Sequence, residues 1–185
     1  MKFNFLPILL LSFTPALAFS GMMDDINKAA GGDVGSKIAD QAKDKAKTEG
    51  NKKIAVQVNK KLLDEGRKNQ CSFKSGTETL EAGCDSKSKK LAKIIIDVKN
   101  SLQSKGQSGF KFIVSGHTDS TGNAEKNKDL SMRRAQVMVK ELIAKGVNAS
   151  DIEAIGMGSE QLLVKPDDTP AKQAKNRRYE IQVRF

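Results

Sequence analysis

The stretch FKFIVSGHTDSTG, residues 110–122, decides the fold of this chain. Its first part, Phe110 to Gly116, alternates apolar and other residues and predicts a strand. A polar turn bounded by glycines follows, and LSMRRA at 130–135 then begins a helical pattern that Gly146 stops. The order of strand, polar turn and helix predicts one unit of an α/β fold, with the acid Asp119 in the turn at the carboxyl end of the strand.

On either side of this unit the sequence keeps alternating helical and extended patterns. We expect a weak strand over 71–80, a helix over 86–102, a helix over 130–145, a strand over 152–156, a short helix opened by Thr169 and Pro170, and a final strand over 179–185. Strands that alternate with helices of this length imply right-handed crossovers. The predicted fold class is therefore α/β: over residues 71–185, a two-layer sandwich whose mixed sheet carries helices on one face.

Residues 19–70 carry few large apolar side chains and have high helical propensity. Two helices are predicted, over 36–47 and 52–64, with Gly50 between them. We expect a mostly helical spacer or linker with one helix docked on the domain. The alternative is a helical region, within 19–65, that binds a protein partner or a membrane surface.

The first 18 residues have the pattern of a secretory signal peptide. An apolar run over 3–11 is followed by the small-x-small site Ala16-Leu17-Ala18, which predicts cleavage before Phe19. A retained membrane anchor is disfavoured, because Pro7 interrupts the run and the run is shorter than the roughly 20 residues that a span requires.

Charge and cysteine content agree with an exported protein. The formal net charge is +10 over 185 residues, which outside the cytoplasm suits membrane headgroups or cell-wall polymers. Nucleic-acid binding is not expected, because aromatic stacking residues are scarce. In an oxidising compartment Cys71 and Cys84 are predicted to form a disulfide. The rival interpretation, a metal site, lacks ligands because the sequence has one histidine, so neither a metal nor a cofactor is expected.

Helix geometry distinguishes the two neighbouring arginines of the 130–145 pattern. At about 100° per residue, Arg134 falls on the broad apolar side and Arg133 points away from it. A partly covered guanidinium requires an anion. Glu141, which faces a similar direction further along the helix, could supply this anion. Alternatively, Arg134 and the backbone N–H groups near the helix start could jointly hold a ligand carboxylate.

Asp119 also has two interpretations, a ligand-binding acid or a turn-capping aspartate. His117 is expected to be a hydrogen-bonded structural residue, since no partner acid or nucleophile has a recognisable spacing. An acid and a base that face one pocket suit a ligand with both an ammonium and a carboxylate. Such a site needs no catalysis, and no catalytic set is assembled in the sequence, so an enzyme is not expected.

Several short motifs occur together in the second part of the chain: GHTD at 116–119, Asn127, LSMRRA at 130–135, GMG at 156–158 and NRRYEI at 176–181. Together they resemble the OmpA C-terminal family of peptidoglycan-binding domains. The resemblance covers about residues 71–185. It implies a βαβαβ-type sandwich that binds the peptidoglycan stem peptide non-covalently, chiefly through the zwitterionic end of diaminopimelate.

By this resemblance, Asp119 takes the ammonium of the ligand and Arg134 its carboxylate. Asn127, eight residues after Asp119 and seven before Arg134, would hydrogen-bond the peptide. Thr118 and Thr121 would lie beside the acid.

Two further residues are candidates of second rank. Arg177 belongs to the last motif, and Lys74 stands where many members carry an acid, which would weaken the ammonium side or select another feature of the stem peptide. The resemblance implies a periplasmic protein associated with the cell wall, with the outer membrane as a candidate location. The alternative function is an envelope assembly adaptor that recruits a protein partner through residues 19–65.

Overall fold

The computed structural model describes residues 34–74 and 76–185. The chain divides into two compact units, Met1–Glu49 and Gly50–Phe185. In the first unit, the described residues 34–49 are helical. The predicted signal peptide, residues 1–18, and the spacer up to residue 33 lie outside the described residues. The second unit contains the candidate site.

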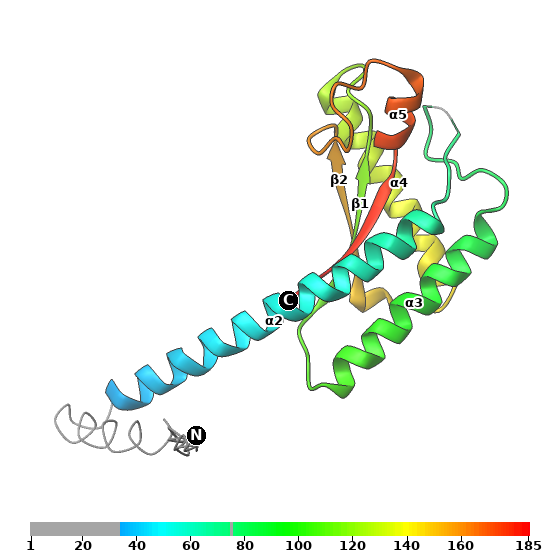
Figure 1. The fold of residues 1–185 in the computed structure, drawn as a ribbon. Coiled ribbons are helices and arrows are strands. Elements are labelled where there is room, and N and C mark those ends of the chain that lie inside the picture. Colours follow the sequence, from blue (N-terminus) through cyan, green and yellow to red (C-terminus); the bar gives the residue numbers. More distant parts are fainter. Residues whose placement is uncertain (1–33, 75) are drawn as a thin grey trace, which may run out of the picture. The chain divides into compact units, whose positions relative to one another are not determined.

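The helices and strands are shown in Figure 1, and from Cys84 onward they follow the predicted order. They are α2 (Val34–Lys68), α3 (Cys84–Ser104), β1 (Lys111–His117), α4 (Ala124–Ala144), a 3-10 turn (Ala149–Asp151), β2 (Ile152–Gly158), α5 (Pro170–Asn176) and β3 (Tyr179–Arg184). The short helix α5 begins as predicted, with Thr169 as its cap and Pro170 as its first residue. Within 34–74 and 76–185, no helix combines the length and apolar character needed to cross a membrane.

The sheet is mixed, and β1 is its central strand, in the order β2-β1-β3. Strand β1 runs parallel to β2, where Val114 lies opposite Ala154, and antiparallel to β3, where Val114 lies opposite Ile181. Because both neighbours flank β1, the turn that follows its last residue, His117, emerges from the middle of the sheet.

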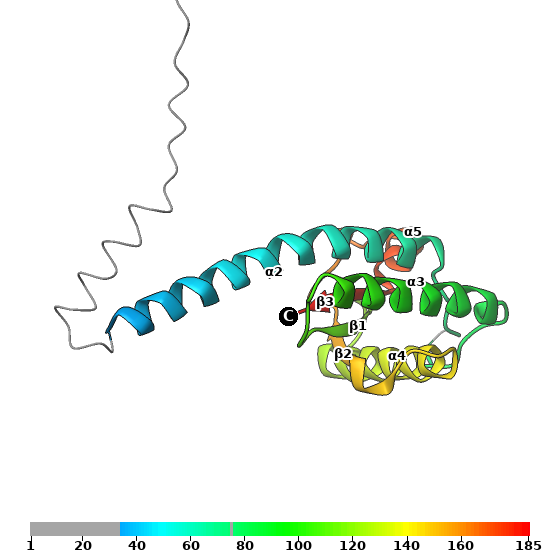
Figure 2. The same cartoon turned by 90° about the horizontal axis from the view of Figure 1, so that it is seen from below.

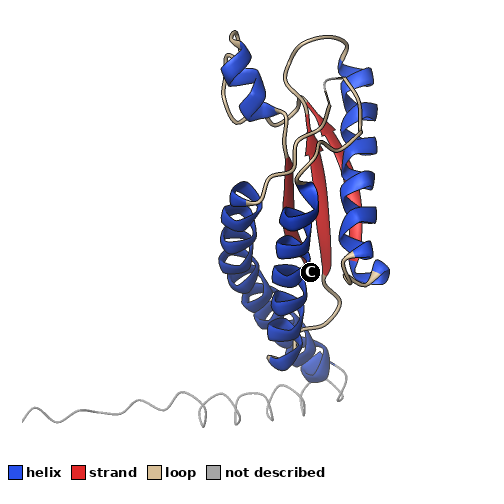
Figure 3. Cartoon of the chain, turned by 90° about the vertical axis from the view of Figure 1, so that its right-hand side faces the viewer, coloured by secondary structure: helices blue, strands red, loops and turns tan. Residues whose placement is uncertain are grey.

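One layer of helices covers the sheet, as predicted. The second part of α2, from Gly50, lies beside α3, and α4 lies on the other side of α3 (Figures 2 and 3). The core between the layers takes its side chains from both periodic patterns. Among them are Phe112, Val114, Ile181 and Val183 from the sheet, and Leu91, Ile95, Met138 and Leu142 from the helices. The fold class predicted from the sequence is confirmed.

Helix α2 differs from the prediction, because Gly50 does not interrupt it. A glycine inside a helix costs only about 1 kcal/mol relative to alanine, and strong helix formers surround this one. Beyond Gly50 the predicted stripe docks on the core, where Leu62 is buried and Ile54 and Val58 pack against it. The Asn59 side chain also accepts from the Val183 N–H at 2.7 Å and donates to the Val183 carbonyl at 3.2 Å, which satisfies main-chain groups of the edge strand β3.

The predicted strand over 71–80 is not formed by the described residues of this segment, 71–74 and 76–80. Their one ladder contact is an isolated bridge between Phe73 and Leu80, and the Lys74 N–H donates to the Thr79 carbonyl at 2.9 Å across a turn. The predicted disulfide between Cys71 and Cys84 is present, with the two Cα atoms 5.1 Å apart. We call the segment that it closes, residues 71–84, the disulfide loop.

Helix α4 begins at Ala124, six residues before the predicted start at Leu130. The Asn123 side chain caps it by accepting from the Lys126 N–H at 3.0 Å. The first turns are exposed and polar, so no apolar period marks them in the sequence.

Candidate functional site

Asp119 lies two residues after His117, the last residue of β1, and is 7% exposed. Its Oδ1 accepts from the Thr121 N–H at 3.1 Å and from the Thr121 hydroxyl, and its Oδ2 accepts from Arg177 Nη1 at 2.8 Å. Burial alone would raise the pKa of this carboxyl, but the hydrogen bonds from Thr121 and Arg177 outweigh it and hold the pKa below the usual 3.8. Asp119 is therefore a carboxylate at neutral pH and also makes the local turn contacts of a capping aspartate.

Arg134 lies on the covered side of α4, as predicted, and is 5% exposed. Its Nε donates to the Thr77 carbonyl at 2.9 Å, and its guanidinium carbon lies 5.2 Å from the centre of the Phe73 ring. The disulfide loop thus fixes both the direction and the plane of this guanidinium.

Within the described part of the chain, no carboxylate lies at ion-pair distance from Arg134. Glu141, the alternative partner, instead accepts from the Ser88 hydroxyl at 2.8 Å and pairs with Lys145. Burial lowers the pKa of Arg134, and the nearby charge of Arg177 lowers it further, yet an arginine stays protonated at neutral pH. Arg134 is therefore a buried cation that the charges of Asp119 and Glu78 compensate only from beyond ion-pair distance.

The alternative in which backbone N–H groups at the start of the helix bind an anion jointly with Arg134 is wrong. Arg134 stands ten positions after Ala124, the first residue of α4, so the unpaired N–H groups at the helix start lie too far along the helix to share an anion with it. Arg133 is half-exposed and pairs with Asp129 and with Glu78, which agrees with its assignment to the solvated side.

Asp119 and Arg134 line one pocket of about 340 Å³, which we call the acid–base pocket. Its other lining residues are Gly76, Thr118, Thr121, Asn127, Leu130, Gln173 and Arg177. The structure therefore brings together six of the seven candidate ligand-binding residues. Lys74 is the exception: it is exposed and lines none of the pockets described here.

The amide of Asn127 also supports the turn. Its Nδ2 donates to the Thr121 carbonyl at 2.8 Å and lies 3.5 Å from the Asp119 carbonyl. The Thr118 hydroxyl is buried and has no hydrogen-bond partner among the described residues. The turn is thus held on one side by Asn127, and Thr118 lines the pocket with its hydroxyl oxygen buried.

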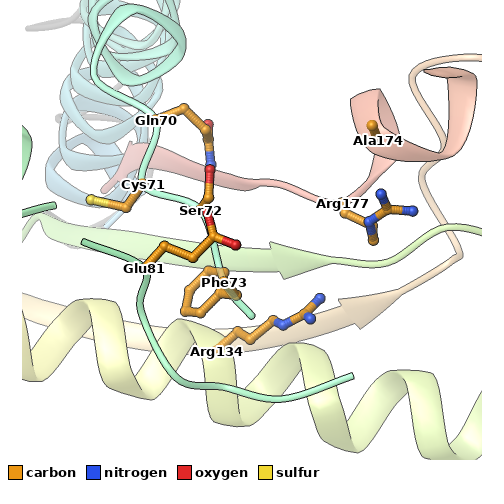
Figure 4. Close-up of a pocket in the computed structure, with 8 residues that line it drawn as sticks. All are labelled: Gln70, Cys71, Ser72, Phe73, Glu81, Arg134, Ala174 and Arg177. Atoms are coloured by element: carbon orange, nitrogen blue, oxygen red, sulfur yellow. The ribbon is translucent and has the colours of Figure 1, made fainter. Parts of the chain in front are cut away.

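A second pocket of about 380 Å³ lies next to the first, and Arg134 and Arg177 border both. We call it the loop pocket. Its lining residues are Gln70, Cys71, Ser72, Phe73, Glu81, Arg134, Ala174 and Arg177. Figure 4 shows the two guanidinium groups approaching the same space, Arg134 from α4 and Arg177 from the end of α5, with Glu81 and Phe73 on the side of the disulfide loop.

Sequence reasoning missed the contribution of the disulfide loop. Phe73, Gly76 and Thr77 either line the acid–base pocket or hold Arg134, although none was a candidate site residue. The one available signal was the cysteine pair that brackets them, because a closed loop must lie close to the elements at its two ends.

A network of hydrogen bonds that includes buried polar side chains supports the turn that contains Asp119. Asp167 accepts from the Ser120 N–H at 2.8 Å, from the Ser120 hydroxyl and from Asn176 Nδ2 at 3.0 Å. The Asn176 Oδ1 accepts in turn from the N–H groups of Leu163 and Val164 at 2.8 and 3.0 Å. The hydrogen bonds from Ser120 hold the pKa of Asp167 below its usual value. Asn176, the first residue of the last motif, is therefore a structural residue.

Glycines of the GHTD and GMG motifs allow helix α4 to pack closely against the sheet. A Cβ added at Gly116 would lie 2.1 Å from the Ser131 carbonyl oxygen, and one added at Gly156 would lie 2.6 Å from the Lys128 carbonyl oxygen. Helix α4 therefore lies directly on the backbone of β1 and β2, which brings Arg134 within reach of the pocket.

His117 has the structural role expected of it. It is 1% exposed, lines neither the acid–base pocket nor the loop pocket, and has its Nε2 3.4 Å from the Ser115 hydroxyl. Burial, together with the charge of Arg178, lowers its pKa to about 4. Over residues 34–74 and 76–185, no group of three or more His, Cys, Asp or Glu side chains is arranged to hold a metal ion.

The region of this chain that matches a known family contains the candidate site residues. A family model described as the OmpA family matches residues 72–177. Over 70 residues the chain is 40% identical to the peptidoglycan-binding protein ArfA of Mycobacterium tuberculosis, which covers 38% of this chain and 21% of that protein. Over 75 residues it is 33% identical to the peptidoglycan-associated lipoprotein of Pseudomonas aeruginosa, which covers 40% of this chain and 44% of that protein.

The fold has a counterpart among solved structures. The peptidoglycan-associated lipoprotein from Burkholderia pseudomallei superimposes with a TM-score of 0.51 at 21% identity, over 62% of this chain and 89% of that chain. At this identity the likeness concerns the fold alone. The chain spans less than half the length of the two curated relatives named above.

Proposed function

The chain belongs to the OmpA family, and from that premise we propose that it binds peptidoglycan non-covalently and is thereby tethered to the cell wall. The observation that carries this proposal is the pairing, in one pocket, of the ionised Asp119 with the buried and carboxylate-free guanidinium of Arg134. Two relatives that match this region are named for peptidoglycan binding or association.

The ligand that fits these charges is the distal end of diaminopimelate in the stem peptide. That end carries an ammonium and a carboxylate on one carbon, so it can reach an acid and a base that line one small pocket. We assign the ammonium to Asp119 and the carboxylate to Arg134, whose planar donors suit bidentate binding.

The remaining lining residues position the peptide and the turn. Asn127 and Thr121 hold the Asp119 turn, and Thr118 lines the pocket beside the acid. Arg177 borders the pocket through its contact with Asp119. We assign no ligand contact to Lys74, because its exposed side chain lies outside the pocket lining.

The function is binding rather than catalysis, in keeping with the OmpA-family peptidoglycan-binding proteins, which are not enzymes. A cell-wall ligand requires export, so we propose a periplasmic location with residues 1–18 as the cleaved signal.

Sedimentation with insoluble peptidoglycan tests this function. Wild-type protein should pellet with diaminopimelate-type peptidoglycan and much less with lysine-type peptidoglycan, whose side chain has an ammonium but no distal carboxylate. Asp119→Ala and Arg134→Ala should remain in the supernatant, whereas Arg133→Ala, a matched loss of charge on the solvated side of α4, should pellet like wild type. Equal pelleting of all variants would mean that the net charge of +10, not the pocket, causes the association.

A further inference from the structure

The two carboxylate oxygens of Asp119 are occupied differently. Oδ1 accepts two hydrogen bonds from Thr121, one from its N–H and one from its hydroxyl, so the turn uses it fully. Oδ2 accepts from Arg177 Nη1 at 2.8 Å, and this is its one contact among the described residues. A ligand ammonium that is to bind Asp119 must therefore approach Oδ2, the position that Arg177 holds.

Arg177 is held loosely enough to leave that position. It follows the last residue of α5, its side chain is 43% exposed, and within the described residues Asp119 is the one polar partner of that side chain. The neighbouring Arg178 is fixed by contrast, since it donates to Glu180 at 2.7 Å and to the main-chain carbonyls of Asn176 and Gln161. An ion pair with one half-exposed partner contributes little stability and exchanges readily.

The structure also provides a place for the displaced side chain. Arg177 lines the loop pocket as well as the acid–base pocket, and Glu81 lies on the opposite wall of the loop pocket (Figure 4). Rotation of the Arg177 side chain away from Asp119 and into the loop pocket would take it toward a second carboxylate, Glu81.

We propose that Arg177 is an internal counterion that occupies the ammonium position at Asp119 in the free protein, and that it determines which stem peptides this site prefers. The inference rests on the proposed function, since it concerns the same ligand end. A ligand with a free distal amine can bind Asp119 only if it displaces Arg177. A ligand whose distal amine is acylated, as in a cross-linked stem peptide, leaves Arg177 in place and binds through its carboxylate to Arg134.

The consequence is a weak preference between the two kinds of peptide. In the wild type, the ammonium replaces an existing cation at Asp119, so its net contribution to binding is small. Without the Arg177 charge the same ammonium meets an unpaired carboxylate, and its contribution rises by about the strength of one exposed ion pair. Arg177 thus lets one site accept both free and acylated stem-peptide ends.

Titration of the purified full chain with two soluble peptides tests the proposal. Both are stem tripeptides that end in diaminopimelate and are blocked at the first amine; the distal diaminopimelate amine is free in one and acetylated in the other. Arg177→Gln should bind the free-amine peptide on the order of two- to fivefold more tightly than wild type, the range expected for removing one exposed ion pair. Its affinity for the acetylated peptide should stay unchanged or fall.

Lys175→Gln is the matched control, because it removes the same charge from an exposed position two residues away. It should leave the ratio of the two affinities at the wild-type value. If Arg177→Gln also leaves the ratio unchanged, or weakens binding of the free-amine peptide, the counterion role is overturned while the binding site stands. If wild type binds neither peptide, the proposed function fails, and the inference fails with it.

Discussion

The Nε of Arg134 donates a hydrogen bond to the main-chain carbonyl of Thr77, 2.9 Å away, and so joins helix α4 to the disulfide loop. Phe73, from the same loop, lies under the guanidinium. The orientation of the proposed carboxylate-binding group therefore depends on a segment that has almost no regular structure of its own and is closed by the disulfide Cys71–Cys84.

Reducing this disulfide should weaken both stability and ligand binding. The two cysteines are 13 positions apart, and opening a loop of this size costs about 3 kcal/mol of unfolding free energy. Urea unfolding of oxidised protein and of the Cys71→Ser, Cys84→Ser double variant measures the loss. The double variant should also pellet less with peptidoglycan under native conditions, because Thr77 and Phe73 are no longer held against Arg134. Equal pelleting would show that the loop does not orient the site.

Lysine should not replace arginine at position 134. Arg134→Lys keeps the charge but loses the bond from Nε to Thr77 and the flat face that packs on Phe73, so peptide affinity should fall at least about tenfold. Calorimetric titration with the stem tripeptide measures this. Arg133→Lys, on the solvated side of the same helix, should bind within about twofold of wild type. Similar affinities for the two variants would contradict the assigned role of Arg134.

Alanine at Gly116 should destabilise the domain. The added Cβ would lie 2.1 Å from the Ser131 carbonyl oxygen, which forces α4 away from the sheet, and we expect a loss of more than about 2 kcal/mol in urea unfolding. Gly66→Ala, in helix α2, is the control. No atom lies within 4 Å of its added Cβ, so it should stabilise by about 1 kcal/mol. A neutral Gly116→Ala would mean that the close packing of α4 is not required.

Stability should decrease in mild acid because of His117. Burial and the charge of Arg178 lower its pKa from 6.5 to about 4 in the fold. Between these values the unfolded chain binds a proton that the folded chain does not, so the unfolding free energy falls as pH drops from 6.5 toward 4. The loss from about pH 7 to about pH 5 should be on the order of 2 kcal/mol.

Urea unfolding at these two pH values checks the effect. His117 is the one histidine in the sequence, so His117→Gln should remove most of the dependence over this range. An unchanged slope in the variant would assign the pH dependence to other groups.

The parts of the site that the sequence predicted are those that lie on periodic elements. Apolar spacing placed Arg134 on the covered side of α4 and Arg133 outside it, and the strand pattern placed Asp119 at the end of β1. Both placements follow because the apolar spacing shows which face of the helix or strand is buried.

The parts that it did not predict lack such a period. Helix α4 starts at Ala124 with exposed polar turns, and the disulfide loop holds Arg134 through a main-chain carbonyl, which no side-chain pattern encodes. The continuous α2 also limits the adaptor hypothesis: residues from Gly50 pack on the core, so a partner-binding role is better sought before Gly50. That role stays a prediction.

The pairing of Arg134 with the ligand carboxylate is tested most directly by a cycle of affinities. Calorimetry would compare the stem tripeptide ending in diaminopimelate with the same peptide amidated at the distal carboxylate, for wild type and for Arg134→Gln. Wild type should lose at least about tenfold in affinity on amidation, whereas Arg134→Gln should bind both peptides equally weakly. If Arg134→Gln discriminates between the two peptides as strongly as wild type does, the carboxylate is bound elsewhere and the assignment of Arg134 is wrong.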